Sequence, residues 1–289
     1  MSGSHEPEAI VERAHAKLNV FLRVLGRRDD GDHDIQTVIL PLDLHDPVAV
    51  TPAEAFAVTV TGPRAEELAR AGGESLVARA AEAFRAATGI APSVHVAIEK
   101  RIPVGAGMGG GSADAAALLR ALGRLHPAAT PALPEIAAAV GADVPALLHG
   151  GPVYADGRGD HVTPVHAVTT HWALAPFPFA VRTPDAYAWW DGEPSTGPDP
   201  GALIAALETG SLDLLGHAMF DDLQRVVVAR HPPIASVIER FLDAGALGAV
   251  MTGSGPTVVA LASSPLHADR IAAAVRGASV TSGPPPSAA

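Results

Sequence analysis

Apolar and polar residues alternate along the segment 14–24, AHAKLNVFLRV, and this pattern is typical of a β-strand with one buried face. Ala, Leu and Val occupy the even positions, whereas Lys17 and Asn19 stand two residues apart among the odd ones. Side chains two residues apart on a strand point to the same side, about 7 Å from each other. The pattern therefore predicts a strand that presents Lys17 and Asn19 together on its polar face.

Comparable patterns predict the elements that follow, with a turn in the segment GRRDDGDHD after the first strand. Further strands are expected at 35–44, 56–61, 94–98, 152–156 and 172–181, and a last one, AVMTGSGPTVVAL, is interrupted by a glycine turn. Helices are expected at 74–88, 112–125, 133–140, 201–208 and 233–244. The Pro- and Gly-rich stretch 191–201 is expected to be a flexible insertion.

The composition is that of a globular protein. With 289 residues, 48% of them hydrophobic and 18% charged, the chain is long enough for two domains of about 150 residues each. It contains no cysteine, which excludes disulfides, thiolate nucleophiles and cysteine metal sites. No apolar run approaches the roughly 18 residues of a membrane span, and the first residues do not resemble a signal peptide. A cytoplasmic protein is therefore expected.

The charge balance narrows the choice of partner. Asp and Glu number 31 against 20 Lys and Arg, which gives a formal net charge of -11. Such a chain is repelled by nucleic acid and by anionic lipid. The expected partner is a small-molecule substrate, with no nucleic acid and no membrane, and the protein is expected to be a monomer or a homodimer. No metal site is expected, because the histidines at 161, 166 and 171 suit neither one helix face nor one strand face.

A cluster of glycines carries the strongest chemical signal. Five of the seven residues from 105 to 111 are glycine, and they lie between the strand at 94–98 and a helix that Ser112 opens. The backbone N–H groups of such a loop can approach an anion closely, and the helix adds the positive end of its dipole. The loop is therefore expected to bind phosphate, and the alternative is a tight turn that needs positive φ angles.

The common phosphate-binding motifs do not fit this loop. Residues 105–110 match GxGxxG, but the acidic residue that a dinucleotide-binding fold places about 20 positions later is missing. A Walker A loop is excluded because no Gly-Lys-Ser/Thr ends the segment, and the His-Arg-Asp and Asp-Phe-Gly motifs of protein kinases are absent. The chain has only two lysines, Lys17 and Lys100, and both stand at motif positions. This rarity favours functional roles over ordinary surface positions.

Several motifs occur in a fixed order and together resemble one family. They are Ala16-Lys17-Leu18-Asn19-Val20-Phe21-Leu22, Gly26-Arg27-Arg28-Asp29-Asp30-Gly31-Asp32-His33, the glycine loop at 103–113, Gly141-Ala142-Asp143-Val144-Pro145 and Met251-Thr252-Gly253-Ser254-Gly255-Pro256-Thr257. The set resembles the GHMP kinases, named for galactokinase, homoserine kinase, mevalonate kinase and phosphomevalonate kinase. Within that superfamily it is similar to the kinases of 4-diphosphocytidyl-2-C-methyl-D-erythritol, over residues 14–262.

The resemblance implies an α+β fold with two domains. The N-terminal, ATP-binding domain would resemble domain 2 of ribosomal protein S5 and span 13–160. The C-terminal, substrate-binding domain would be a ferredoxin-like α/β sandwich over 161–276, and the substrate would lie between the domains. Residues 1–12 would form a flexible leader and residues 277–289 a flexible tail.

The resemblance also implies a reaction in which ATP, carried with Mg²⁺, phosphorylates the 2-hydroxyl of the cytidine diphosphate-linked methylerythritol in non-mevalonate isoprenoid biosynthesis. Asp143 would act as the base, and Lys17 would hold it ionised and offset charge on the transferred group. Asn19, His33 and Tyr187 would bind the substrate. The ATP contacts would come from Lys100, Pro103, Val104, Gly105, Ala106, Gly107, Met108, Gly109, Gly110, Gly111, Ser112 and Ala113.

Each of these residues also has a structural interpretation. Asp143 could be a helix N-cap before Pro145, Lys17 a surface lysine, His33 a solvated turn residue and Tyr187 a core residue. These alternatives remain open from the residues alone.

The chain departs from the family pattern at three positions. Asp32 replaces the tyrosine that stacks on cytosine, Asp221 stands where the family has Asn, and Ser75 replaces an Asn near adenine. Two further hypotheses follow from these departures. One is a GHMP kinase for a different small alcohol or sugar, and the other is a nucleotide-binding protein without catalytic activity.

Overall fold

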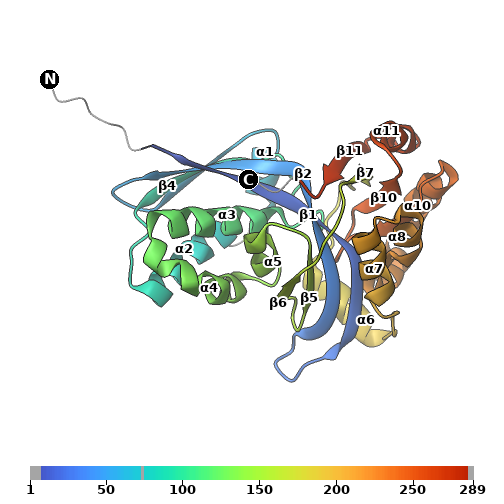
Figure 1. The fold of residues 1–289 in the computed structure, drawn as a ribbon, viewed down its shortest axis with the longest axis horizontal. Coiled ribbons are helices and arrows are strands. Elements are labelled where there is room, and N and C mark those ends of the chain that lie inside the picture. Colours follow the sequence, from blue (N-terminus) through green and yellow to red (C-terminus); the bar gives the residue numbers. More distant parts are fainter. Residues whose placement is uncertain (1–7, 73–74, 286–289) are drawn as a thin grey trace. The chain divides into compact units, whose positions relative to one another are not determined.

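A computed structural model describes residues 8–72 and 75–285 (Figure 1). Its residues group into two compact units that are not consecutive in the sequence. Unit 1 consists of the described residues up to Ala16, His45–Val104 and Gly110–His149. Unit 2 consists of Lys17–Leu44, Gly105–Gly109 and the described residues from Gly150 onward. The first two strands, β1 (Ile10–Arg27) and β2 (His33–Pro52), each contribute residues to both units.

In unit 1, the strand that leads to the glycine loop belongs to a seven-stranded sheet. The second half of β2 pairs antiparallel with β4 (Val94–Glu99), and β4 pairs parallel with β3 (Ala57–Thr61). Val94, Val96 and Ile98 of β4 are buried, as the alternation in the sequence predicts. The chain then leaves β4 at Lys100 and enters the loop.

The helices of unit 1 pack through small and apolar side chains. The longest described helix is α3 (Gly110–Leu125), and its alanines at 113, 115, 116, 117 and 121 are buried. Such short side chains allow α2 (Leu76–Thr88) and α5 (Val144–His149) to pack closely against it. The unit also contains α1 (Ala65–Ala71), the 3-10 helix η1 (Pro127–Ala132) and α4 (Leu133–Val140).

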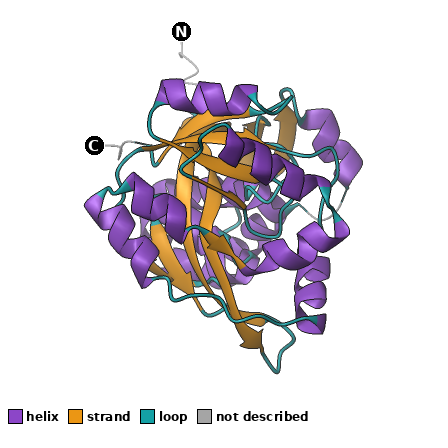
Figure 2. Ribbon diagram, turned by 90° about the vertical axis from the view of Figure 1, so that its right-hand side faces the viewer, coloured by secondary structure: helices purple, strands orange, loops and turns teal. Residues whose placement is uncertain are grey.

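Unit 2 contains a four-stranded antiparallel sheet. Figure 2 shows all strands in orange and all helices in purple. The strand order is β11 (Ser279–Gly283), β7 (Thr170–Ala175), β10 (Val258–Ala262) and β9 (Gly248–Met251). Helices α10 (Pro233–Asp243) and α11 (Pro265–Ala273) pack against it. Every residue of β10 is buried, which is expected for a central strand covered on both faces.

The remaining described elements of unit 2 are three short strands beside the hairpin formed by β1 and β2, and four helices. The first half of β2 pairs with β5 (Val153–Asp156), β5 pairs with β6 (His161–Pro164), and β1 pairs parallel with the short β8 (Phe220–Asp221). Helix α6 (Thr183–Gly192) packs against α9 (Asp222–Arg230), and α7 (Gly201–Thr209) packs against α8 (Leu212–Ala218).

Most elements expected from the sequence are present, with shifted ends. The helix at 133–140 has the expected bounds, whereas α3 begins at Gly110, two residues before Ser112. The strand expected at 172–181 ends at Ala175. The interruption of the last strand is confirmed, because β9 and β10 are separated by residues 252–257.

The flexible ends expected from the sequence are shorter than predicted. The flexible tail over 277–289 is wrong for Ser279–Gly283, which pairs with β7 because its backbone completes the edge of that sheet. The flexible leader over 1–12 is wrong for its last residues, since β1 already begins at Ile10 and Glu12 is buried. Residues 1–7 and 286–289 lie outside the described residues. The stretch 191–201 is a loop only over residues 193–200. The domain division into 13–160 and 161–276 stays a prediction.

Candidate active site

Alternate residues of the glycine loop adopt a backbone conformation that favours glycine. Gly105, Gly107 and Gly109 have φ angles of 66°, 76° and 68°, and the residues between them, Ala106 and Met108, are buried. Side chains other than glycine are strained at such positive φ angles. The loop therefore needs three of its glycines for conformation, and it ends directly at the N-terminus of the 16-residue helix α3.

A second glycine turn lies against the first within unit 2. A Cβ atom on Gly107 would lie 2.6 Å from the backbone oxygen of Thr252, a distance that real Cβ atoms do not reach. Gly253, in the same turn as Thr252, has a φ angle of 60°, and a Cβ atom there would lie 2.8 Å from Oδ1 of Asn19. Glycine is thus favoured at Gly107 because two backbone segments approach each other closely, and at Gly253 because of its positive φ angle and the nearby Asn19 side chain.

Lys17 and Asn19 lie together in a buried hydrogen-bond network of unit 2. The Lys17 ammonium donates to Oδ1 of Asn19 at 2.5 Å, and the backbone N–H of Lys17 donates to the carbonyl oxygen of Met108 in the glycine loop. Asn19 donates from its backbone N–H to Oγ1 of Thr252 and from its side-chain amide to Oγ1 of Thr37. Both side chains are nearly inaccessible, at 4% and 3% exposed. The surface-lysine interpretation of Lys17 is therefore wrong.

Asp143 lies in unit 1, at the turn that directly precedes α5. It is half-buried, and its backbone carbonyl accepts a hydrogen bond from the N–H of Leu147 in the first turn of that helix. The position agrees with the N-cap interpretation, which does not exclude a catalytic role for the carboxylate. Pro145 falls in the first turn of α5, where its missing N–H has no cost.

Lys100 has a different environment from the one that a nucleotide contact would need. Its ammonium is 2% exposed and lies 2.7 Å from Oδ2 of Asp46 and 2.5 Å from Oδ2 of Asp114. The other oxygen of Asp46 accepts hydrogen bonds from the backbone N–H groups of Arg101 and Ile102, at 2.5 and 2.9 Å. This buried cluster, Asp46–Lys100–Asp114, ties the end of β4 to the first turns of α3, the two elements that hold the glycine loop.

Burial has the largest effect on the pKa of Asp114 in this cluster. It raises the pKa of the Asp114 carboxyl to about 7, against the lowering effect of the Lys100 ammonium. Oδ1 of Asp114 is buried and has no hydrogen-bond partner in the described part of the chain. Asp46 and Asp114 belong to none of the sequence motifs, because a lone aspartate carries no local signal.

The His33 imidazole is held by three side chains of α6. Its Nε2 atom lies 2.7 Å from Oδ1 of Asp191, and its ring stacks on Tyr187 with centroids 4.6 Å apart and planes inclined by 28°. Trp190 contacts the ring edge-on, at 6.0 Å between centroids and 89° between planes. The His33 side chain is 8% exposed, so its interpretation as a solvated turn residue is wrong. The sequence placed His33 and Tyr187 in one site but did not identify Asp191.

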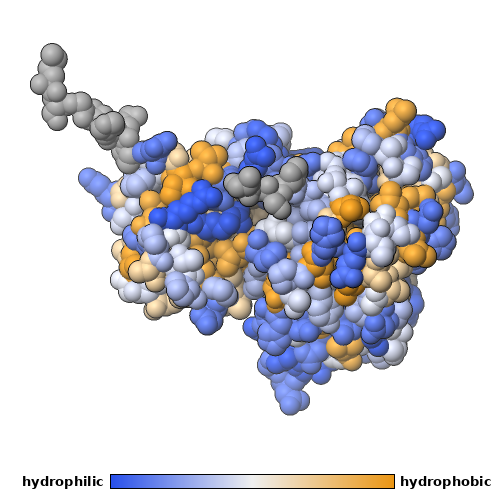
Figure 3. All heavy atoms as spheres, in the orientation of Figure 1, coloured by the Kyte–Doolittle hydropathy of each residue, from blue (hydrophilic) through white to orange (hydrophobic). Residues whose placement is uncertain are grey.

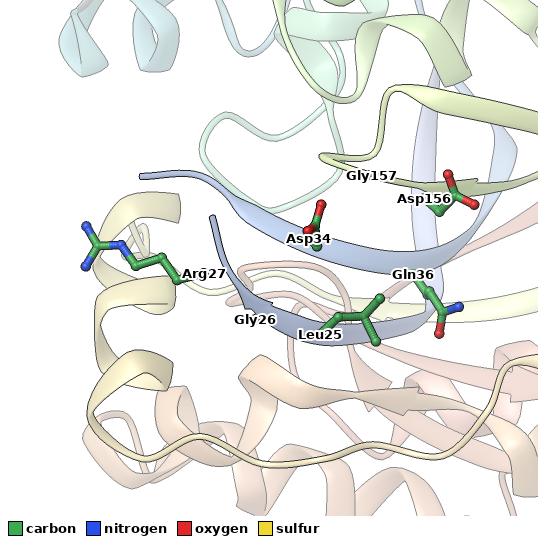
Figure 4. Close-up of a pocket in the computed structure, with 7 residues that line it drawn as sticks. All are labelled: Leu25, Gly26, Arg27, Asp34, Gln36, Asp156 and Gly157. Atoms are coloured by element: carbon green, nitrogen blue, oxygen red, sulfur yellow. The ribbon is translucent and has the colours of Figure 1, made fainter. Parts of the chain in front are cut away.

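A pocket of about 460 Å³ opens beside this histidine site, where the β1–β2 hairpin meets the end of β5 (Figure 4). It combines one cation, two carboxylates and one amide with an apolar side chain and two glycines. Its lining residues are Leu25, Gly26, Arg27, Asp34, Gln36, Asp156 and Gly157. Nη1 of Arg27 lies 3.5 Å from Asp191, which connects the pocket wall to the partner of His33.

The tip of the hairpin is polar and exposed, as its hydrophilic surface in Figure 3 shows. Asp32, which stands at the position of the family tyrosine, has a side chain that is 58% exposed and lies 3.4 Å from Arg158. Arg28 contacts Asp30 and Asp34 across the turn. Asp32 therefore provides no aromatic surface for a base, and the aromatic groups of this region come from α6.

Two further carboxylates are buried behind the hairpin. Asp222 accepts hydrogen bonds from the backbone N–H of Val24 and from the hydroxyl of Ser195, at 2.9 and 2.6 Å. Asp221 caps the N-terminus of α9 by accepting from the N–H of Leu223. Burial raises the pKa of the Asp221 carboxyl well above its ordinary value, although the Leu223 N–H and the charge of Lys17 lower it. The departure from Asn at this position thus places an ionisable group in the interior.

Within residues 8–72 and 75–285, no group of three or more His, Asp or Glu side chains is arranged to hold a metal ion. Over the same residues, no helix has both the length and the apolar character to cross a membrane.

The chain matches two family profiles, and both describe the same class. The profile "GHMP kinases N terminal domain" matches residues 75–151, and the profile "GHMP kinases C terminal" matches residues 203–280. The fold is thus the two-domain α+β fold of the GHMP kinases, a class of ATP-dependent kinases.

Several relatives at 38–40% identity share one name. The chain is 40% identical to the 4-diphosphocytidyl-2-C-methyl-D-erythritol kinase of Kineococcus radiotolerans, over 94% of this chain and 89% of that protein. It is 38% identical to the kinase of the same name from Rhodococcus jostii, over 98% and 95% of the two chains. A crystal structure of 4-(cytidine 5'-diphospho)-2C-methyl-D-erythritol kinase superposes with a TM-score of 0.79 at 34% identity, over 94% of this chain and 98% of the other. The chain belongs to the 4-diphosphocytidyl-2-C-methyl-D-erythritol kinase family of the GHMP kinases.

Proposed function

We propose that this kinase transfers the γ-phosphoryl group of ATP to the 2-hydroxyl of 4-diphosphocytidyl-2-C-methyl-D-erythritol, a step of non-mevalonate isoprenoid biosynthesis. The observation that carries the proposal is the identity of about 40% with proteins of that name over nearly the whole chain. The motif residues Lys17, Asn19, His33 and Asp143 are all present in the order that the resemblance requires.

In the proposed reaction, the hydroxyl oxygen forms a bond to the γ-phosphorus while the bond to the bridging oxygen of ADP breaks. The hydroxyl proton passes to the Asp143 carboxylate, and the electron pair of the broken bond leaves with ADP. The Lys17 ammonium offsets the negative charge that spreads over the phosphoryl oxygens. Its hydrogen bond to Asn19 keeps the long side chain in one orientation, so that little rotamer freedom is lost when substrates bind.

The glycine loop over 103–113 is the proposed phosphate site. Its alternating positive φ angles need residues without Cβ, and the N–H groups at the start of α3 add the positive end of a 16-residue helix. Mg²⁺ is proposed to arrive bound to the ATP phosphates, where it neutralises charge. Lys100 is proposed to act through the loop, because its ammonium is enclosed by Asp46 and Asp114.

His33, Tyr187 and Asn19 are the proposed substrate contacts. His33 and Tyr187 would bind the cytosine end, and their rings stack on each other with centroids 4.6 Å apart. Asn19, two residues from Lys17 on β1, would bind near the reacting hydroxyl.

A second candidate is a GHMP kinase that uses another small alcohol or phosphorylated sugar. The observation that favours it is Asp32, which is exposed and paired with Arg158 where the family has an aromatic residue. A binding protein without catalysis is the third candidate, and retention of Lys17 and Asp143 opposes it.

The decisive experiment measures ADP release with Mg-ATP, with and without 4-diphosphocytidyl-2-C-methyl-D-erythritol. Wild-type protein should release ADP only when the cytidine substrate is present. Asp143→Asn should lower this rate at least about 100-fold, whereas the control Asp213→Asn, on the exposed side of α8, should leave it unchanged. Turnover of another alcohol, without turnover of the cytidine substrate, would establish the second candidate. ATP binding without phosphorylation of any acceptor would establish the third.

The proposal places the enzyme in the cytoplasm as a monomer or a homodimer. Light scattering of the purified protein tests the oligomeric state, and cell fractionation tests the location.

A further inference from the structure

The side chains that hold His33 come from one face of one helix. Tyr187, Trp190 and Asp191 occupy positions i, i+3 and i+4 of α6, which are neighbours on a helix surface. Tyr187 covers one face of the imidazole, Trp190 meets its edge, and Asp191 binds Nε2. Aromatic contacts thus fix the orientation of the His33 ring, and a carboxylate binds its Nε2 atom.

Asp191 is suited to control the proton on this ring. Its side chain is 25% exposed, and its second oxygen lies 3.5 Å from Nη1 of Arg27. A carboxylate accepts hydrogen bonds and donates none when it is ionised, so the atom it binds on the ring must be an N–H. In the neutral imidazole, a proton on Nε2 leaves Nδ1 with a free lone pair.

The second ring nitrogen is the one available to a ligand. Nδ1 of His33 makes no hydrogen bond to any of the residues that the structure describes. With the ring orientation fixed by Tyr187 and Trp190, Nδ1 is a hydrogen-bond acceptor at a set position.

We infer that Asp191 is a positioning residue that makes Nδ1 of His33 a hydrogen-bond acceptor and thereby selects cytosine over uracil. The inference rests on the proposed function, in which His33 meets the base of the substrate. Cytosine carries an amino group that donates hydrogen bonds, whereas uracil carries a carbonyl oxygen at the same ring position. An acceptor nitrogen binds the amino group and is repelled by the carbonyl oxygen.

The first test compares the binding of CDP and UDP by calorimetry. Wild-type protein should bind CDP at least about tenfold more tightly than UDP, which is the discrimination expected for one well-placed hydrogen bond to a base. Asp191→Ala should bring the two dissociation constants to within about twofold of each other. Asp191→Asn should keep most of the preference, because the amide oxygen still accepts from Nε2.

A control variant separates this effect from a general change in charge. Glu193 lies two residues beyond Asp191 at the end of α6 and pairs with Arg225 instead of His33. Glu193→Ala changes the net charge by the same amount as Asp191→Ala and should leave the CDP preference unchanged. Thermal unfolding of each variant shows whether the fold persists.

A second measurement reads the proton on the ring directly. The ¹⁵N chemical shifts of His33 in wild-type protein should show a protonated Nε2 and an unprotonated Nδ1. Asp191→Ala should lose this bias and Asp191→Asn should retain it. In the kinase assay, Asp191→Ala should raise KM for the cytidine substrate at least about fivefold and leave kcat within about twofold, because the base lies away from the transferred phosphoryl group.

The outcomes distinguish this inference from the proposed function. If Asp191→Ala keeps the tenfold preference, or if Nδ1 carries the proton in wild-type protein, the role of Asp191 is wrong while the kinase activity stands. If wild-type protein phosphorylates the cytidine substrate but binds CDP and UDP equally, the inference is likewise wrong. If wild-type protein neither binds CDP nor phosphorylates the cytidine substrate, both the inference and the proposed function are wrong.

Discussion

The two lysines of the chain lie in two regions that look alike in the sequence and differ in the structure. Both side chains are almost completely buried, at 4% for Lys17 and 2% for Lys100. Lys100 is enclosed by the carboxylates of Asp46 and Asp114 in unit 1, whereas Lys17 donates to the neutral amide of Asn19 in unit 2. A rare residue at a motif position is therefore not by itself a catalytic group.

The physical difference lies in what each ammonium stabilises. Lys100 compensates two buried carboxylates, one of which also holds two backbone N–H groups before the glycine loop. Lys17 belongs to a network that joins β1 to the glycine loop through Met108 and to the second glycine turn through Asn19 and Thr252. We therefore expect Lys100 to contribute to the stability of the folded protein and Lys17 to contribute to phosphoryl transfer.

The largest expected effect is on stability, from Lys100→Met. Removing the ammonium leaves Asp46 and Asp114 buried without a compensating charge, which costs about 3–5 kcal/mol of unfolding free energy. Urea unfolding followed by circular dichroism measures this loss. The control is Arg101→Met, whose guanidinium pairs with Glu99 on the exposed surface and should change stability by less than about 1 kcal/mol. Equal losses in the two variants would contradict the assignment of Lys100.

Lys17→Met should lower activity strongly and stability less than Lys100→Met does. Loss of a charge that stabilises the transferred phosphoryl group should lower kcat at least about 100-fold. The variant should lose less stability than Lys100→Met, and ATP binding measured by calorimetry should persist. A variant that unfolds as readily as Lys100→Met, with normal kcat in the remaining folded protein, would make the two lysines equivalent.

Alanine substitutions at two glycines, Gly107 and Gly110, test the geometry of the glycine loop. Gly107→Ala would bring a Cβ atom to 2.6 Å from the backbone of Thr252 at a φ angle of 76°, whereas Gly110→Ala would place it 3.1 Å from Nζ of Lys100 and from Ile102 in a helical position. Gly107→Ala should therefore destabilise the protein by about 1–3 kcal/mol and raise KM for ATP more than Gly110→Ala does. Steady-state kinetics at varied ATP concentration compares them, and a larger effect at Gly110 would contradict the loop geometry.

The smallest expected effect is a pH dependence of the unfolding free energy, which arises from Asp114. Because burial raises its pKa to about 7 in the folded protein, above the unfolded value, the folded state binds more protons and wild-type stability falls as pH rises through this range. Asp114→Asn removes this contribution, so the variant should gain about 1 kcal/mol relative to wild type between pH 6 and pH 7. Urea unfolding at each pH measures the difference.

Glu82→Gln provides the control for this titration. Its pKa is lowered by Arg85, so Glu82 is ionised in both states throughout that range and its stability difference should stay constant. A constant difference for Asp114→Asn as well would show that Asp114 is ionised in the folded protein at pH 6.

The local features of the fold followed from the sequence to a considerable extent. Alternation over 14–24 predicted β1, and five glycines in seven residues predicted a loop that leads into a helix. These signals are local, because side-chain alternation and positive φ angles depend on residues close in the chain. The elements that the sequence missed include α6 and α9, whose apolar residues stand next to one another instead of at helical spacing, and β11, whose backbone is ordered by pairing with β7.

The sequence by itself therefore determined the kinase family, the glycine loop before a helix and the pairing of Lys17 with Asn19 on one strand face. Only the tertiary structure decided that Lys100 is enclosed by Asp46, 54 residues away, and that His33 is held by Asp191, 158 residues away. Such contacts have no local pattern, because they depend on how distant elements pack. The residue type shows whether a side chain can carry a charge. Its partner, its pKa and its role depend on the groups that packing brings within hydrogen-bond distance.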